Sequence, residues 1–270
     1  MRLRIAAIAM AALASLAAAP AATARVAATP TLEGTVALNN CSAAVVRLTT
    51  LGDNDPAILQ TNGHCLETGF PSPGQVITNQ ASSRTGQLLN AGGTSVGTVR
   101  ATKVLYSTMT GTDVTWYQLN QSYAEVAKLG VKILELAGSH PTAGSDITVA
   151  SGYWKRLYTC NIDGFVYQLK EGGWTNTDSI RYTSACKTIG GTSGSPIIEH
   201  STGKVIGINN TGNESGERCT ENNPCEVDQS GNVTVRKGIN YGQQTYQLYG
   251  CMDAGTKLNL NKPGCALPKP

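Results

Sequence analysis

Gly191-Thr192-Ser193-Gly194-Ser195-Pro196 forms a glycine- and serine-rich turn, and the apolar run Lys204–Ile208 follows it. Working outward, similar short runs rich in Val, Ile, Thr and Tyr, bounded by Gly, Pro, Asn or Ser, occur along the chain: Val36–Leu38, Ala44–Thr49, Ala57–Gln60, Gln75–Thr78, Thr98–Tyr106, Asp113–Leu119, Asp146–Ala150, Phe165–Leu169 and Ser179–Tyr182. Many short strands with turn-rich spacers predict an all-β barrel or sandwich.

One helix is expected, over Ser122–Leu129. Ser122 and Glu125 have the spacing of a capping box, and Gly130 follows as a stop signal. The stretch Ala137–Gly144 is rich in turn residues, and we expect it to connect two β-rich halves.

The first 24 residues predict a secretory signal peptide. Arg2 and Arg4 precede the apolar run Ile5–Ala19, and Ala22-Thr23-Ala24 is a small-residue cleavage site. The apolar run is shorter than the roughly 20 residues that a membrane span needs, and no other stretch is long enough. We therefore expect a secreted protein without a membrane partner, in which residues 25–30 are the candidate for a short propeptide.

Charge and composition argue against nucleic acid as a partner. The net charge is only +3, and it becomes smaller when the two arginines of the signal peptide are set aside. Aromatic residues make up 6% of the chain, too few for a base-stacking surface.

The eight cysteines all lie beyond the signal peptide, and an even number in an oxidising compartment predicts four disulfides. Zinc sites favour close cysteine pairs with histidines nearby, a pattern that is missing here. Sequence order does not determine the pairing, although it suggests neighbours: Cys41 with Cys65, Cys160 with Cys186, Cys219 with Cys225, and Cys251 with Cys265.

A general base near neutral pH has few candidates, because the chain has 3 histidines. His140 lies in the connector, and His200 lies about 20 Å along a strand from Ser193 at about 3.3 Å per residue. His64, in Thr61-Asn62-Gly63-His64-Cys65, stands beside a cysteine that would anchor its loop. His64 is therefore the candidate base, although single loop histidines are often structural.

Ser193 is the candidate nucleophile. A serine nucleophile needs an exposed hydroxyl on a tight turn, with backbone N–H groups free to bind an oxyanion, and flanking glycines permit that backbone. The N–H groups of Gly191 and Ser193 would be those donors. A turn that only joins two strands would have the same composition.

Asp113 is the candidate acid that would orient the histidine. The other aspartates between His64 and Ser193 are explained by turns: Asp146, Asp163 and Asp178. Asp113 instead begins an apolar strand, where a buried carboxylate needs hydrogen-bond donors.

The three motifs, TNGHC, TDV and GTSGSP, occur in the order His, Asp, Ser, and together they resemble the trypsin/chymotrypsin-like serine peptidases. Within that family, the sequence most resembles secreted bacterial members, either the actinobacterial trypsin-like peptidases or the glutamyl endopeptidases. The resemblance extends over about 34–250, with supporting matches in Gly144–Tyr153 and Val205–Asn209.

This resemblance implies two packed six-stranded antiparallel β-barrels with the active site between them. The peptidase domain would cover 31–250, with barrels at about 31–130 and 140–250 and a disulfide-tied tail over 251–270. His64, Asp113 and Ser193 would form the catalytic triad, and Gly191 and Ser193 the oxyanion hole. The family mechanism needs no metal or organic cofactor, and we expect a monomer acting on proteins or peptides.

Several positions depart from trypsin. Thr192 replaces the aspartate that pairs with a newly freed N-terminus in the animal enzymes, so that activation switch is not expected. Lys187 stands where trypsins have an aspartate, which argues against a preference for Lys or Arg. Thr188 and Asn209 fall at pocket positions, and only Thr188 matches glutamyl endopeptidases. Lys187 would favour acidic substrate residues unless an insertion after Cys186 moves it away.

Two alternatives remain. Gly93-Thr94-Ser95-Val96-Gly97 fits the nucleophile elbow of an α/β-hydrolase, with Ser95 and His200 in the required order, but a strand-like run follows it instead of a helix. A peptidase-like fold can also be catalytically silent and serve as a binding protein, because intact residues do not guarantee an open cleft.

Overall fold

A computed structural model describes residues 29–270. The expected signal peptide and residues 25–28 of the propeptide candidate lie outside the described residues. Within 29–270, no helix has the length and apolar character needed to cross a membrane.

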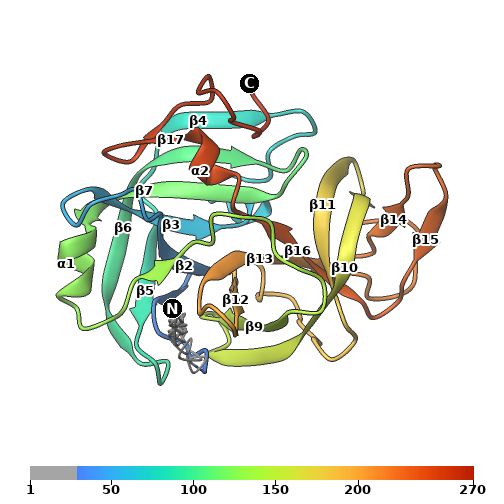
Figure 1. Cartoon of the computed structure of the whole chain (residues 1–270), viewed down its shortest axis with the longest axis horizontal. Helices are drawn as coiled ribbons and strands as arrows, with labels where there is room; N and C mark the ends of the chain where they lie inside the picture. The colour runs from blue at the N-terminus through green and yellow to red at the C-terminus, as the bar shows by residue number, and fades with distance from the viewer. Residues whose placement is uncertain (1–28) are drawn as a thin grey trace, which may run out of the picture.

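The first half of the described chain forms a closed antiparallel barrel (Figure 1). Its six strands follow the order β1-β5-β6-β7-β3-β2, and pairing of β1 with β2 closes the ring. Their bounds are Thr35–Ala37 (β1), Ser42–Arg47 (β2), Pro56–Thr61 (β3), Thr85–Leu89 (β5), Ser95–Thr108 (β6) and Val114–Ser122 (β7). Two further strands pair with members of this ring. β4 (Val76–Ala81) pairs antiparallel with β6, and β8 (Leu134–Glu135) pairs parallel with β2.

The second half repeats this architecture in the order β11-β16-β13-β12-β9-β10, and pairing of β10 with β11 closes the ring. Its strands are Asp146–Ser151 (β9), Arg156–Glu171 (β10), Trp174–Tyr182 (β11), Pro196–Glu199 (β12), Val205–Gly212 (β13) and Asn240–Gln244 (β16). A hairpin of β14 (Cys225–Val227) and β15 (Val233–Val235) extends the sheet beyond β10. The predicted all-β class with two six-stranded barrels is confirmed.

Each barrel buries its own apolar core. Val45, Ile58 and Trp116 belong to the first core, and Ile147 and Ile180 to the second. Burial of these β-branched and aromatic side chains stabilises the two closed rings.

Helices are few and short among the described residues. The predicted helix is present as α1 (Tyr123–Ala127), and its N-terminus has the expected capping box between Ser122 and Glu125. A single 3-10 turn, η1 (Gly63–Cys65), lies after β3, and α2 (Leu248–Cys251) follows β16.

Four disulfides join the neighbouring cysteines in the order that the sequence suggests: Cys41–Cys65, Cys160–Cys186, Cys219–Cys225 and Cys251–Cys265. The first fastens η1 to the start of β2, and the second links β10 to the segment before Ser193.

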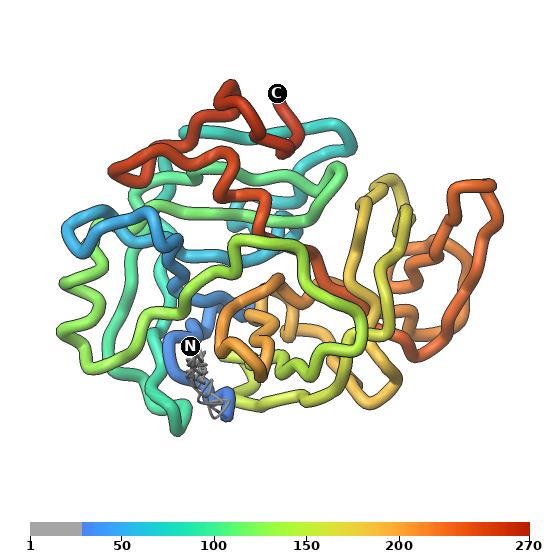
Figure 2. The backbone as a smooth tube through the Cα atoms, viewed as in Figure 1, coloured from blue at the N-terminus to red at the C-terminus, as the bar shows by residue number. Residues whose placement is uncertain are grey.

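The C-terminal tail returns to the first barrel, as the red segment in Figure 2 shows. It contains a small hairpin of β17 (Met252–Asp253) and β18 (Lys257–Leu258). Leu267 is buried in the first core, and the Tyr106 hydroxyl donates to the carbonyl oxygen of Pro268 at 3.0 Å. The first barrel is therefore completed by residues from the far end of the sequence.

Candidate active site

His64 and Asp113 form a close pair on the first barrel. His64 lies on η1, and Asp113 lies directly before β7. The carboxylate accepts two hydrogen bonds from His64, one from the backbone N–H at 3.1 Å and one from ring Nδ1 at 2.8 Å. Asp113 is buried, which keeps water from competing for the imidazole. The structure therefore brings these two candidate residues together.

The surroundings of His64 raise the pKa of its imidazole above 6.5. Burial alone would lower this pKa, but the negative charge of Asp113 and its hydrogen bond outweigh burial, and the charge of Glu171 adds to them. The pair therefore stabilises an imidazolium, the state that a general base reaches when it takes a proton.

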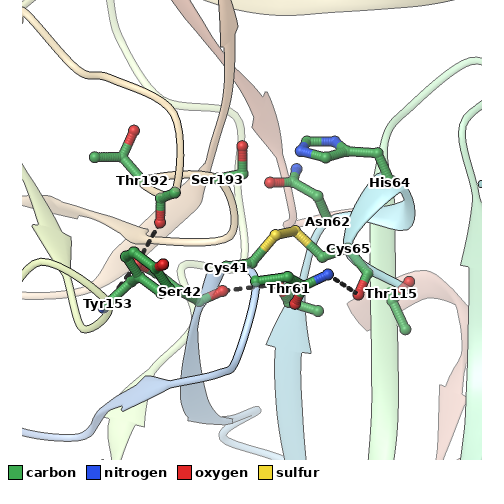
Figure 3. Close-up of a disulfide and its surroundings, with 12 residues drawn as sticks. Cys41, Ser42, Thr61, Asn62, His64, Cys65, Thr115, Tyr153, Thr192 and Ser193 are labelled. Atoms are coloured by element: carbon green, nitrogen blue, oxygen red, sulfur yellow. Dashed lines mark hydrogen bonds between the residues drawn. A yellow bond between two sulfur atoms is a disulfide. The ribbon is translucent and has the colours of Figure 1, made fainter. Parts of the chain in front are cut away.

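Ser193 lies on the loop before β12 and faces the same cleft as His64. Figure 3 shows the His64 ring extending toward Ser193 from the opposite side of the Cys41–Cys65 disulfide. The Ser193 hydroxyl donates to the carbonyl oxygen of Asn210 at 3.1 Å. A rotation about its Cα–Cβ bond is therefore required before it can donate to Nε2 of His64.

The first barrel holds the Ser193 loop through backbone contacts. The N–H of Ser42 donates to the carbonyl oxygen of Ser193 at 2.8 Å. Gly194 has φ +81°, and a Cβ there would lie 2.0 Å from the carbonyl oxygen of Ser42. Only glycine permits this approach, so the residue after Ser193 is part of the joint between the barrels.

Two backbone N–H groups flank Thr192 on this loop. Within residues 29–270, the N–H groups of Gly191 and Ser193 donate to no protein acceptor. The loop is braced from outside, where indole Nε1 of Trp154 donates to the carbonyl oxygen of Gly190 at 2.7 Å. Open donors on a braced loop have the character of an oxyanion site.

Thr192 is held by neutral groups. Its hydroxyl donates to the carbonyl oxygen of Ile189 and accepts from Nδ2 of Asn209 at 3.1 Å. Thr192 and Asn209 are both buried. The position that is an aspartate in trypsins is thus occupied here without any charge.

Two of the three residues predicted to determine specificity line the cleft, and the third does not. Thr188 and Asn209 line the cleft, but Lys187 is exposed and is absent from the cleft lining. Sequence reasoning missed the wall formed by Phe70, Glu171 and Trp174, which comes from both barrels. The Gly-Gly pair after Glu171 indicates only a hairpin, so no local signal marks this glutamate.

The β10–β11 hairpin joins that wall to the first barrel. Trp174 Nε1 donates to the carbonyl oxygen of Pro71 at 2.9 Å, and the Phe70 ring contacts both Trp174 and His64 edge to face. The N–H of Gly111 also donates to the carbonyl oxygen of Thr175 at 2.9 Å. The second barrel therefore supports the loops that carry His64 and Asp113.

The remaining candidates lie elsewhere. His140 contacts Asp178, and His200 contacts Thr148. Ser95 begins β6 and donates to Gln87, so its motif is a strand start and not an elbow before a helix. Ligand atoms of Cys41, His64 and Cys65 lie within 4.8 Å of one another, but the two cysteines share a disulfide and offer no thiolate to a metal.

Comparison with protein families finds a match of residues 41–208 to the model described as "Trypsin-like peptidase domain". A search of curated proteins finds no significant match. Among solved structures, the chain is similar to three proteases that differ widely from it in sequence. The active form of the Rv3671c protease from M. tuberculosis has 14% identity and a TM-score of 0.49, with 94% of this chain and 97% of that chain covered. A Glu endopeptidase has 14% identity and a TM-score of 0.43, with 79% and 85% covered. The Nocardiopsis protease has 12% identity and a TM-score of 0.42, with 78% and 90% covered.

Proposed function

Because this chain belongs to the trypsin-like peptidase family, we propose that it is a secreted serine endopeptidase that cleaves proteins or peptides. The observation that carries the proposal is the His64–Asp113 pair, which shares one cleft with Ser193. The N–H groups of Gly191 and Ser193, on the same loop as Ser193, donate to no acceptor within residues 29–270. This combination supplies a base, an orienting acid, a nucleophile and an oxyanion site.

The reaction would begin when Ser193 Oγ turns from Asn210 toward Nε2 of His64. His64 would take the hydroxyl proton as Oγ bonds to the scissile carbonyl carbon, and then give that proton to the leaving amine. Asp113, bound to Nδ1, would keep Nε2 free to accept and would stabilise the imidazolium. Water would then hydrolyse the acyl-enzyme by the same steps.

The negative charge that develops on the carbonyl oxygen would be bound by the N–H groups of Gly191 and Ser193. Donors that are already in place need no reorganisation during the reaction, so they lower the barrier more than mobile water can. The braces on this loop from Trp154 and Ser42 support such preorganisation.

Secretion is supported by the four disulfides and by the signal sequence expected over residues 1–24. All groups of the site come from one chain, so the acting unit is proposed to be a monomer. Neither nucleic acid nor a membrane is proposed as a partner.

The test is to expose the secreted wild type and Ser193→Ala to a diverse peptide mixture and to map cleavage sites by mass spectrometry. Cleavage by the wild type alone, together with Ser193-dependent labelling by a fluorophosphonate, is the expected result. A folded, disulfide-bonded wild type that neither cleaves nor labels would overturn the proposal in favour of a catalytically silent binding protein.

A further inference from the structure

The cleft beside His64 is acidic although the whole chain carries a net charge of +3. Glu171, Glu214 and Glu221 line it, and no lysine or arginine is among its lining residues within 29–270. Carboxylates around a cleft attract cations and repel anions. An excess of carboxylates by itself makes only a charged surface. A binding site also needs a carboxylate held in a suitable geometry.

Glu171 is fixed in place with one oxygen free. Its Oε1 accepts from the Thr211 hydroxyl at 2.9 Å and from the backbone N–H of Asn222 at 2.8 Å. No group within the described part of the chain donates to Oε2. A half-buried carboxylate held by two donors on one oxygen offers the other oxygen to a ligand at little cost in side-chain entropy.

Residues that line the cleft also carry buried polar atoms without partners. Asn209 is 2% exposed, and its Oδ1 has no hydrogen-bond partner. The orientation of this amide is determined by Thr192, which donates its single hydroxyl proton to Ile189 and must therefore accept from Nδ2. Oδ1 of Asn176, which is 5% exposed, also lacks a partner, and both residues line the cleft. Nδ2 of Asn210, a donor from the same lining, is buried without a partner as well, so these amides make the cleft polar and the carboxylates determine the sign of its charge.

The apolar wall suits the stem of such a ligand. Phe70, Met109 and Trp174 line the cleft near Glu171, and Phe70 is 50% exposed. Lysine and arginine pack their methylene stems on apolar surfaces while their charged heads reach a carboxylate. An acidic side chain would meet no lysine or arginine among the lining residues of this cleft within 29–270.

We propose that Glu171 anchors a lysine or arginine side chain of the substrate next to the scissile bond. This inference rests on the proposed peptidase activity and names the class of substrate that the site takes. It reverses the expectation drawn from Lys187, because the selecting charge comes from the β10–β11 hairpin and not from the segment before Ser193.

The test compares peptides that differ only in having Lys, Arg, Gln or Glu at each position flanking one scissile bond. Wild type, Glu171→Gln and Glu217→Gln are assayed, since Glu217 is an exposed glutamate outside the cleft lining. Gln keeps the acceptor for Asn222 and removes the charge. A hydrogen bond to a charged group is worth about 10- to 100-fold in affinity.

We expect the wild type to prefer the Lys or Arg peptide at one position by that factor. Glu171→Gln should lose the preference, while Glu217→Gln should behave as the wild type. Cleavage without any preference for a cationic residue, or a preference that survives in Glu171→Gln, would overturn this inference and leave the peptidase function intact. A wild type that cleaves nothing and resists fluorophosphonate labelling would overturn both.

A second readout separates an electrostatic role from a structural one. The negative charge of Glu171 contributes, with Asp113, to the raised pKa of His64. Glu171→Gln should therefore move the acidic limb of the kcat/KM profile for the Gln peptide to lower pH. An acidic limb that does not move would show that the charge of Glu171 has no effect on the pKa of His64.

Discussion

Indole Nε1 of Trp154 donates to the carbonyl oxygen of Gly190, the residue directly before Gly191, at 2.7 Å. The C=O of Gly190 and the N–H of Gly191 belong to one trans peptide and point in opposite directions. Trp154 is outside the cleft lining, so holding the oxygen toward Trp154 directs the N–H of Gly191 away from that side chain. Trp154 is therefore expected to position the loop that carries the proposed oxyanion site.

Trp154→Phe keeps the ring and removes the donor. We expect kcat to fall about tenfold with little change in KM, because full loss of an oxyanion donor costs about 100-fold or more and this loop is only loosened. Steady-state kinetics on one peptide provides the measurement. Tyr167→Phe, on an exposed aromatic of β10, is the control that should match the wild type. An equal fall in the control, or a change in KM alone, would contradict the positioning role.

The activity should rise with pH through an apparent pKa above 6.5. His64 must be neutral to accept the proton of Ser193, and although burial opposes it, the charge and hydrogen bond of Asp113 raise the His64 pKa. Asp113→Asn removes both contributions. The acidic limb of the kcat/KM profile should therefore shift to lower pH, and kcat should drop by about 10⁴-fold. A pH profile of kcat/KM for both proteins measures this, and a limb that stays in place in Asp113→Asn would disprove the assignment.

A disulfide that closes a longer loop should stabilise the fold more than one that closes a shorter loop. Replacing Cys41 and Cys65 with alanine opens a separation of 24 residues, whereas replacing Cys219 and Cys225 opens one of 6. Loop-closure entropy predicts losses of about 3.5 and about 2 kcal/mol, respectively. Urea denaturation of the two double variants gives the comparison. The first variant should also lose activity, since the bond fastens the turn that carries His64. A larger loss of stability from the Cys219 pair would refute this ordering.

The C-terminal tail should contribute to the stability of the first barrel. Leu267 is 4% exposed in that core, so Leu267→Ala should lower the free energy of unfolding by about 2–5 kcal/mol. Leu157→Ala, at a leucine that is 40% exposed, should change it by less than about 0.5 kcal/mol. Urea midpoints that are equal for the two variants would mean that the tail is not part of the folded core.

The three motifs that carry the proposed triad can be picked out from the sequence because each lies in a short segment whose chemistry is local. The strand pattern was readable where apolar residues dominate. β16 was missed because its strand buries amides, and Gln243 donates to Ser179 Oγ at 3.1 Å inside the second barrel. Glu171 was missed because its role depends on a hairpin that reaches the opposite barrel. The resemblance to trypsin placed Lys187 at the position of the pocket aspartate. The actual position of that side chain depends on the path of the loop, which residue counting does not give.

The return of residues 245–270 to the first barrel also affects the order of assembly. A chain made from its N-terminus acquires the strands of this barrel early, but Leu267 is among the last side chains of the sequence. The core of the first barrel therefore stays incomplete while the second barrel is being synthesised. A chain that ended before residue 245 would keep all six strands of the first barrel but would lack the Leu267 side chain that completes its core.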